Sequence, residues 1–322
     1  MPSFRSGVVT AILHERSGLQ RVEVDGEKAY VLTQLIGSVA VGDRVVINTT
    51  AVELGLGTGG WHVVHWNLAR DRWQSEVAGR EMKLRYTSLQ VEVSIPAGGH
   101  LPDVPTVGCT LHSQVAAVAL AYKRCRPQGR LVYVMPDGGA LPIAFSDLVH
   151  VLRADGYLHA TVTAGHAFGG DGEATTLDHA LVVAGEFAPD AIVVAIGPGS
   201  LGVGSGAGFS GRDVVRALQV ATDPILSVRY SDADPRLRHA GVSHHAAAVL
   251  DAVEQRVVRV PIPVGEPAPE VGRHKVVAVE VPDLIPDLTA LGVTSMGRLP
   301  SEDPRFWAYA GAAGVVAAGT SR

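Results

Sequence analysis

The side chains best suited to chemistry lie between Ser231 and His245, where carboxylates, guanidinium groups and imidazoles follow one another closely. This segment contains Asp232, Asp234, Arg236, Arg238, His239, Ser243, His244 and His245. A histidine can exchange a proton near neutral pH, and an arginine can bind a carboxylate or a phosphate. The segment therefore predicts general acid–base chemistry on an anionic ligand, with Asp234, His244 and His245 as catalytic candidates and Arg236 and His239 as ligand-binding ones.

A divalent metal ion is an alternative ligand, because its first shell needs about three or four converging nitrogen or oxygen donors. His244 and His245 are adjacent, and adjacent side chains on a helix point about a hundred degrees apart. We therefore do not expect them to face one ion as an i, i+4 pair would. His166 and Asp171, after a different strand, are the candidates for the missing ligands.

The same residues also have structural interpretations. Ser243 would cap a helix, Asp234 would pair with an arginine, and the histidines would bond to loop backbone. Cys109 and His112 form a possible nucleophile and base, although a buried structural cysteine is the commoner explanation.

A glycine-rich loop over residues 197–211 contains Gly197, Gly199, Gly202 and Gly204 as ligand-binding candidates. Its first six residues match G-x-G-x-x-G, whose glycines would let backbone N–H groups approach a pyrophosphate. The next predicted helix starts about a dozen residues later, which disfavours a nicotinamide or flavin site. An anion-binding nest of N–H groups is the better functional interpretation, and a surface loop or subunit interface is the structural one.

The elements that would position these residues alternate between apolar strands and amphipathic helices. Predicted helices occupy residues 112–123, 146–154, 174–187, 213–220 and 244–253. This alternation predicts an α/β fold with a doubly wound, mostly parallel sheet. Ligands bind outside the carboxyl ends of such strands, so His112, Asp137 and His166, each following a strand, should share one rim with the Ser231–His245 segment. On this rim His112, His166 and Asp171 are further catalytic candidates, His166 as an alternative general acid or base, and Asp137 is a ligand-binding candidate.

The first part of the chain has a different pattern. Short β-branched runs with glycine and aspartate turns fill residues 7–67, and a strand pair precedes the Pro/Gly-rich stretch at 96–102. We expect a small β-barrel-like domain plus a β-hairpin over residues 1–98, and a Rossmann-like α/β domain with a C-terminal helical tail over 99–322.

Composition narrows the classes of protein. Hydrophobic residues make up 47% of the 322 residues and charged residues 18%, which is typical of a folded chain. A net charge of −5 without a basic run predicts no nucleic-acid partner. Two cysteines, no signal-peptide core and no apolar stretch of about 20 residues predict a cytoplasmic protein without a membrane partner. The residues identify no cofactor.

Several stretches carry a resemblance to a known family. They are residues 54–60, 82–86, 111–114, 165–171, 197–199, 233–236, 241–245, 296–298 and 303–304. On them the chain resembles a bacterial family known as domain of unknown function 3866, over essentially its whole length. The resemblance implies no reaction, cofactor or catalytic residue. The family usually has an aromatic residue where this chain has Asp232 and Thr or Ser at Ala246, which gives Asp232 less weight than Asp234, Arg236, His239, His244 and His245.

Two hypotheses follow. In the first, an enzyme or small-molecule-binding protein holds an anionic ligand on the rim through the glycine-loop amides and Arg236, and a metal-dependent hydrolase is a variant of it. In the second, a non-catalytic assembly or regulatory protein uses the same segments as an intersubunit contact. A homo-oligomer is expected.

Overall fold

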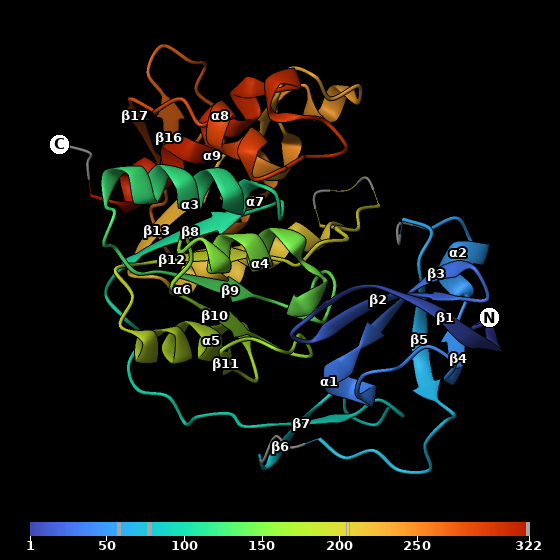
Figure 1. Ribbon diagram of the computed structural model, residues 1–322. Coiled ribbons are helices and arrows are strands. Elements are labelled where there is room, and N and C mark those ends of the chain that lie inside the picture. The colour runs from blue at the N-terminus through green and yellow to red at the C-terminus, as the bar shows by residue number, and fades with distance from the viewer. Residues whose placement is uncertain (57–58, 76–78, 204, 206, 320–322) are drawn as a thin grey trace. The chain divides into compact units, whose positions relative to one another are not determined.

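The computed structural model describes residues 1–56, 59–75, 79–203, 205 and 207–319, and contacts divide the chain into two units, Met1–Ser94 and Ile95–Arg322 (Figure 1). Among the predicted ligand-binding positions, Gly204 lies outside the described residues. Within the described part, no helix combines the length and apolar character that a membrane span requires.

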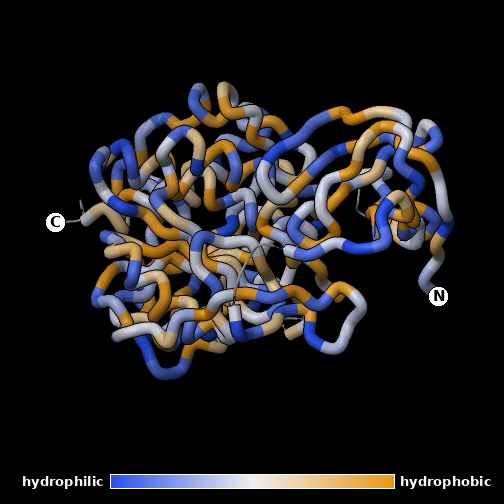
Figure 2. Tube along the Cα trace, turned by 60° about the horizontal axis from the view of Figure 1, so that its bottom comes forward, coloured by the Kyte–Doolittle hydropathy of each residue, from blue (hydrophilic) through white to orange (hydrophobic). Residues whose placement is uncertain are grey.

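The first unit is a closed five-stranded barrel with the strand order β1-β2-β3-β5-β4. Its strands are β1 (Phe4–Arg16), β2 (Leu19–Val24), β3 (Glu27–Leu32), β4 (Arg44–Asn48) and β5 (His62–Asn67). Hydrophobic and hydrophilic residues alternate along them (Figure 2), and the inward ones, among them Val22, Val31 and Ile47, are fully buried. β3 and β5 pair in parallel and the other neighbours pair antiparallel, an arrangement that resembles the Greek-key barrel of OB-folds.

Short elements complete this unit. They are α1 (Thr33–Ile36), α2 (Thr50–Glu53) and the antiparallel pair β6 (Glu81–Lys83) and β7 (Val91–Val93). The predicted barrel and strand pair are both present.

The second unit is built on an eight-stranded parallel sheet with the order β11-β10-β9-β12-β8-β13-β16-β17. The strands are β8 (Pro105–Cys109), β9 (Leu131–Met135), β10 (Ala160–Thr163), β11 (Gly172–Glu173), β12 (Ala191–Ala195), β13 (Asp223–Ser227), β16 (Arg259–Pro263) and β17 (Lys275–Val279). From β8 the chain moves outward through β9 to β10, and from β12 it moves the other way to β13 and β16. This reversal of direction is the switch point at which ligands bind in such sheets.

Helices cover both faces of the sheet. One face carries α3 (Gln114–Cys125), α4 (Asp147–Ala154), α8 (Ile285–Ala290) and α9 (Pro304–Ala317), and the other carries α5 (Leu177–Ala184), α6 (Val214–Val220) and α7 (His244–Ala252). Val193 belongs to the core that includes α3 and α9, whereas its neighbours Ile192 and Val194 belong to the core that includes α5 and α6, as strand alternation requires. The predicted doubly wound fold is confirmed.

Short elements shape the carboxyl rim of this sheet. Whereas η2 (Gly185–Phe187) leads from α5 to the start of β12, the elements at this rim are the hairpin of β14 (Tyr230–Ser231) and β15 (Gly241–Val242) and the 3-10 turns η1 (Ile143–Phe145), η3 (Ser210–Asp213), η4 (Leu237–His239) and η5 (Pro300–Glu302). Two serines fix helix starts there, because the Ser146 hydroxyl accepts from the Val149 amide and the Ser243 hydroxyl from the His245 amide.

Candidate functional site

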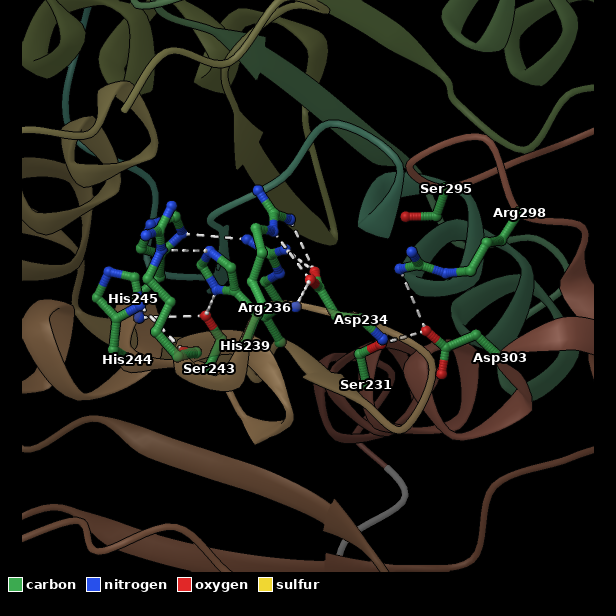
Figure 3. Close-up of polar contacts among 12 residues, drawn as sticks. Ser231, Asp234, Arg236, His239, Ser243, His244, His245, Ser295, Arg298 and Asp303 are labelled. Atoms are coloured by element: carbon green, nitrogen blue, oxygen red, sulfur yellow. Dashed lines mark hydrogen bonds and ion pairs between the residues drawn. The ribbon is translucent and has the colours of Figure 1, made fainter. Parts of the chain in front are cut away.

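The β14–β15 hairpin folds the densest polar segment back over the end of β13. The Ser243 amide donates to the Arg229 carbonyl at 2.9 Å, so α7 begins beside the exit of β13. Between the two hairpin strands, η4 turns His239 toward the start of α7. The hairpin, η4 and the first turn of α7 thus bring their side chains together (Figure 3).

Three imidazoles meet at this point. The ring centroid of His239 lies 4.8 Å from that of His244 and 4.8 Å from that of His245. The centroids of His244 and His245 are 4.4 Å apart. One ring nitrogen from each histidine lies within 4.8 Å of the others. The rings of His244 and His245 are thus close although the residues are adjacent, and η4 supplies the third ring from outside the helix.

A buried ion-pair network lies next to the imidazoles. Arg229 donates to Asp234 at 3.0 Å, and Arg236 donates to both carboxylate oxygens of Asp234 at 2.9 and 2.7 Å. The side chains of Asp234 and Arg229 are only 0% and 3% exposed. The hydrogen bonds from Arg236 hold the pKa of Asp234 far below its usual range, while burial lowers the pKa of Arg229 to about 10.

A serine and a second carboxylate anchor this network from the side of α9. The Ser231 hydroxyl donates to Asp303 and accepts from the Asp234 amide at 3.0 Å. Arg298 pairs with Asp303 at 3.4 Å (Figure 3). The loop that bears Asp234 is therefore tied to the residue that precedes α9.

Burial and stacking set the charge of the imidazoles. The Phe209 ring stacks on His245 at 3.8 Å between centroids, with the planes 2° apart. Burial, followed by the field of Arg229, lowers the pKa of His245 to about 3 and that of His239 to about 4. These lowered pKa values favour the neutral form of both rings at pH 7, in which each imidazole has one nitrogen that can accept a hydrogen bond.

These groups face a cavity of about 300 Å³, which we call the arginine cavity. It is lined by Leu111, Ser200, Leu201, Gly202, Ser205, Phe209, Arg229, Arg236, Arg238, His239, His244, His245 and Met296. Among these described residues three are arginines and none is a carboxylate. The lining is positive and suits an anion.

The glycine loop contributes to this cavity differently from the predicted nest. Gly202 pairs antiparallel with Phe209, and the amides of Val203 and Ser210 donate to Gly208 and Leu201 within the loop. Gly197 is buried, and a Cβ there would lie 2.7 Å from the Ala140 carbonyl, so close packing accounts for this glycine. Gly202 lines the arginine cavity and Gly199 an adjoining one.

His112 is held by neighbouring elements. Its Nδ1 lies 3.0 Å from the Ile196 carbonyl and its Nε2 lies 2.7 Å from the Ser146 hydroxyl. Burial lowers the pKa of His112 to about 4. Cys109 is fully buried, and burial raises the pKa of its thiol to about 12, so the predicted nucleophile is a protonated core residue.

Asp137, His166 and Asp171 lie on the other half of the sheet. The His166 amide donates to Asp137 at 2.9 Å, and Asp171 bonds to Thr161 and pairs with Arg153. β10, which precedes His166, is separated from β13 by three strands, or about 19 Å at the usual strand spacing. His166 and Asp171 therefore do not supply ligands to the imidazole cluster.

Three residues of the site were not predicted. Arg229 follows a strand and is the most buried of the arginines that line the cavity, Phe209 orients His245, and Asp303 anchors Ser231. Asp303 belongs to the stretches that carry the family resemblance, which could have indicated it. Nothing in the local pattern marks Arg229 or Phe209.

Comparison with known proteins identifies the family of this chain, but the description of that family names no activity. A family model described as "Protein of unknown function (DUF3866)" matches residues 28–314. The chain belongs to this family. No curated protein matches it.

In this DUF3866 member, several stretches behind the resemblance converge in space. Residues 233–236 and 241–245 form the hairpin loop and the start of α7, and Arg298 and Asp303 anchor that loop. Stretches far apart in the chain thus build one positive, histidine-rich cavity.

Proposed function

We propose that the arginine cavity binds an anionic small molecule, with a neutral imidazole of the cluster acting on it as a general acid or base. The observation that carries the proposal is the lining, which places three arginines and three histidines around a cavity without a described carboxylate. Arg229 and Arg236 are fixed by Asp234, whereas Arg238 is exposed, lines the cavity and donates from Nε to His239 Nε2 at 3.4 Å. The positive lining and the acid–base groups are the two requirements of the predicted chemistry.

His244 is the best acid–base candidate. It is half-buried and lines the cavity, and its Nδ1 lies 3.1 Å from the Arg238 carbonyl. A carbonyl can only accept, so Nδ1 carries a proton, and in the neutral form of the ring Nε2 would have the free lone pair.

Titration calorimetry with inorganic phosphate and pyrophosphate tests the proposal. Arg238→Ala should weaken pyrophosphate binding by about 10- to 100-fold, the usual effect of a charged hydrogen bond. Arg216→Ala is the matched control, because Arg216 is an exposed arginine that pairs with Asp178 beside another cavity. Equal affinity in both variants, or no binding by the unsubstituted protein, would refute the proposal.

A metal-dependent hydrolase is a second candidate, favoured by the three imidazole nitrogens within 4.8 Å. Metal-binding histidines commonly donate their other N–H to a carbonyl or hydroxyl, and the Nδ1 atoms of His244 and His239 have such partners. His245 differs, because its Nδ1 lies 3.3 Å from Arg229. Stoichiometric zinc in the purified protein, lost in His239→Gln, would establish this candidate over the first.

An assembly protein is a third candidate, favoured by apolar side chains in the loops of the site. Leu201 is 76% exposed and Leu237 is 92% exposed. If these side chains form a subunit contact, Leu237→Asp should shift the protein toward monomer in sedimentation velocity.

A further inference from the structure

A second cavity adjoins the arginine cavity and differs from it in chemistry. It has a volume of about 390 Å³, and six apolar side chains line it, namely Leu111, Leu148, Val151, Leu291, Val293 and Met296. We call it the apolar cavity. Leu111, Ser200 and Met296 line both cavities, so the two are neighbouring compartments with a common border.

The polar groups of the apolar cavity are largely engaged within the protein. Both ring nitrogens of His112 have partners, and the Ser113 hydroxyl lies 2.9 Å from that of Ser295. Among the described lining residues the only charged one is Asp147, and none is a lysine or arginine. An anionic group is therefore disfavoured in this cavity and an apolar group is favoured.

The border between the cavities is a tight turn. Ser295 and Arg298 exchange backbone hydrogen bonds at 3.0 Å across Met296 and Gly297, which both have positive φ, 53° and 79°. A left-handed conformation is unfavourable for a non-glycine residue such as Met296. The turn places Met296 against both cavities, 52% exposed, as an adaptable apolar surface.

We propose that the ligand is an anionic amphiphile, a phosphate or carboxylate attached to an alkyl or similar apolar chain. Its anionic group would bind Arg238 and the imidazoles in the arginine cavity, and its apolar chain would cross Met296 into the apolar cavity. Charge complementarity favours this orientation, because Asp147 opposes an anion in one compartment, whereas the other has three arginines, two of which share the single carboxylate of Asp234. The inference rests on the proposed anion site and adds the substrate class.

A homologous series of alkyl phosphates, from ethyl to octyl and below their critical micelle concentrations, tests this inference by titration calorimetry. Affinity should rise about fourfold with each added methylene until the apolar cavity is filled. Octyltrimethylammonium, with the same chain and a cationic head, should bind at least about tenfold more weakly than octyl phosphate.

Two variants separate the compartments. Val151→Asn should weaken octyl phosphate binding by about tenfold and leave inorganic phosphate binding unchanged. Arg238→Ala should weaken every member of the series by the same factor. Leu13→Asn, at an exposed apolar position of the barrel, is the control for a nonspecific effect of the polar substitution.

The possible failures are distinguishable. Affinity that is independent of chain length, with phosphate binding retained, would overturn the inference and leave the anion site intact. Absence of binding by every phosphate, including the inorganic ion, would overturn the proposed function itself. Sedimentation with phosphatidic acid vesicles that Val151→Asn does not change would indicate a surface contact with lipid and overturn the cavity assignment.

Discussion

Two cavities of similar size on the same rim of the sheet differ in two respects: the sign of the charges that line them, and whether ion pairs hold those charged side chains in place. The arginine cavity lies beyond β8 and β13, and its central pair, Arg229 and Asp234, is almost fully buried. The other, which we call the acidic cavity, has about 330 Å³ and lies beyond β9 and β10 with Asp137 and Asp213 in its lining. Its cation, Arg216, is 61% exposed.

The difference shows that a strand exit alone does not make an organised site. Burial, followed by the nearby charge of Asp137, raises the pKa of Asp213, so the acidic cavity holds like charges that the fold does not neutralise. In the arginine cavity a buried carboxylate orients two guanidinium groups. Organised charge therefore depends on the inserted β14–β15 hairpin, which carries Asp234.

The largest effect should come from breaking the buried pair. Arg229→Met leaves Asp234 buried with Arg236 as its remaining partner, which should lower the free energy of unfolding by about 3 kcal/mol in urea denaturation. Arg216→Ala in the acidic cavity removes an exposed pair and should change it by no more than about 0.5 kcal/mol. Similar losses in both variants would contradict the comparison.

An intermediate effect should appear as a dependence on pH. The pKa of His245 is about 3 in the folded protein against an ordinary value of 6.5, so the unfolded chain binds a proton first as the pH falls. The free energy of unfolding should therefore decrease by about 1.4 kcal/mol per pH unit for this histidine below pH 6.5. His245→Gln should remove this contribution to the slope. Between pH 6.5 and pH 5 the variant should therefore lose about 2 kcal/mol less of its free energy of unfolding than the unsubstituted protein does.

Urea titrations from pH 7.5 down to pH 3 measure this slope and where it ends, and His239→Gln provides a parallel case. The pKa of His239 is about 4 in the folded protein, so its contribution should end at a higher pH than that of His245. An unchanged slope in both variants would show that the two rings are not held neutral.

The smallest effect concerns the acidic cavity. Because the folded pKa of Asp213 is raised, its carboxylate opposes folding at neutral pH, and Asp213→Asn should increase the free energy of unfolding by less than about 1 kcal/mol. The gain should diminish as the pH falls and the carboxyl is protonated. Asp171→Asn should have the opposite sign, because Asp171 pairs with Arg153. A loss in Asp213→Asn would sink the claim of unneutralised charge.

The fold could be predicted from the sequence because its signals are local. Apolar strands alternating with amphipathic helices indicate parallel pairing, and Ser243 marks the start of α7 as a cap. The lateral order of the strands is not local, since it depends on which crossover passes over which neighbour. For this reason His166, after β10, was wrongly expected beside a cluster that lies beyond β13.

The candidate site was predictable only in part for the same reason. Asp234, Arg236, His239, His244 and His245 are close in sequence, and the hairpin brings them together. The contacts of His245 with Phe209 and Arg229 connect separate loops, and no pattern within either loop encodes them. The anion-binding role of the glycine loop stays a prediction, and the amides of Val203 and Ser210 bond within the loop.

The anchoring of Ser231 by Asp303 has a consequence for biosynthesis. Asp303 immediately precedes α9, and α9 packs against α3, where Gly314 permits close contact with the Val118 carbonyl. During translation every strand of the sheet leaves the ribosome before this helix does. A nascent chain halted before residue 303 already contains every strand of the parallel sheet, yet the loop that orients the guanidinium groups would still lack the Asp303 carboxylate that binds Ser231.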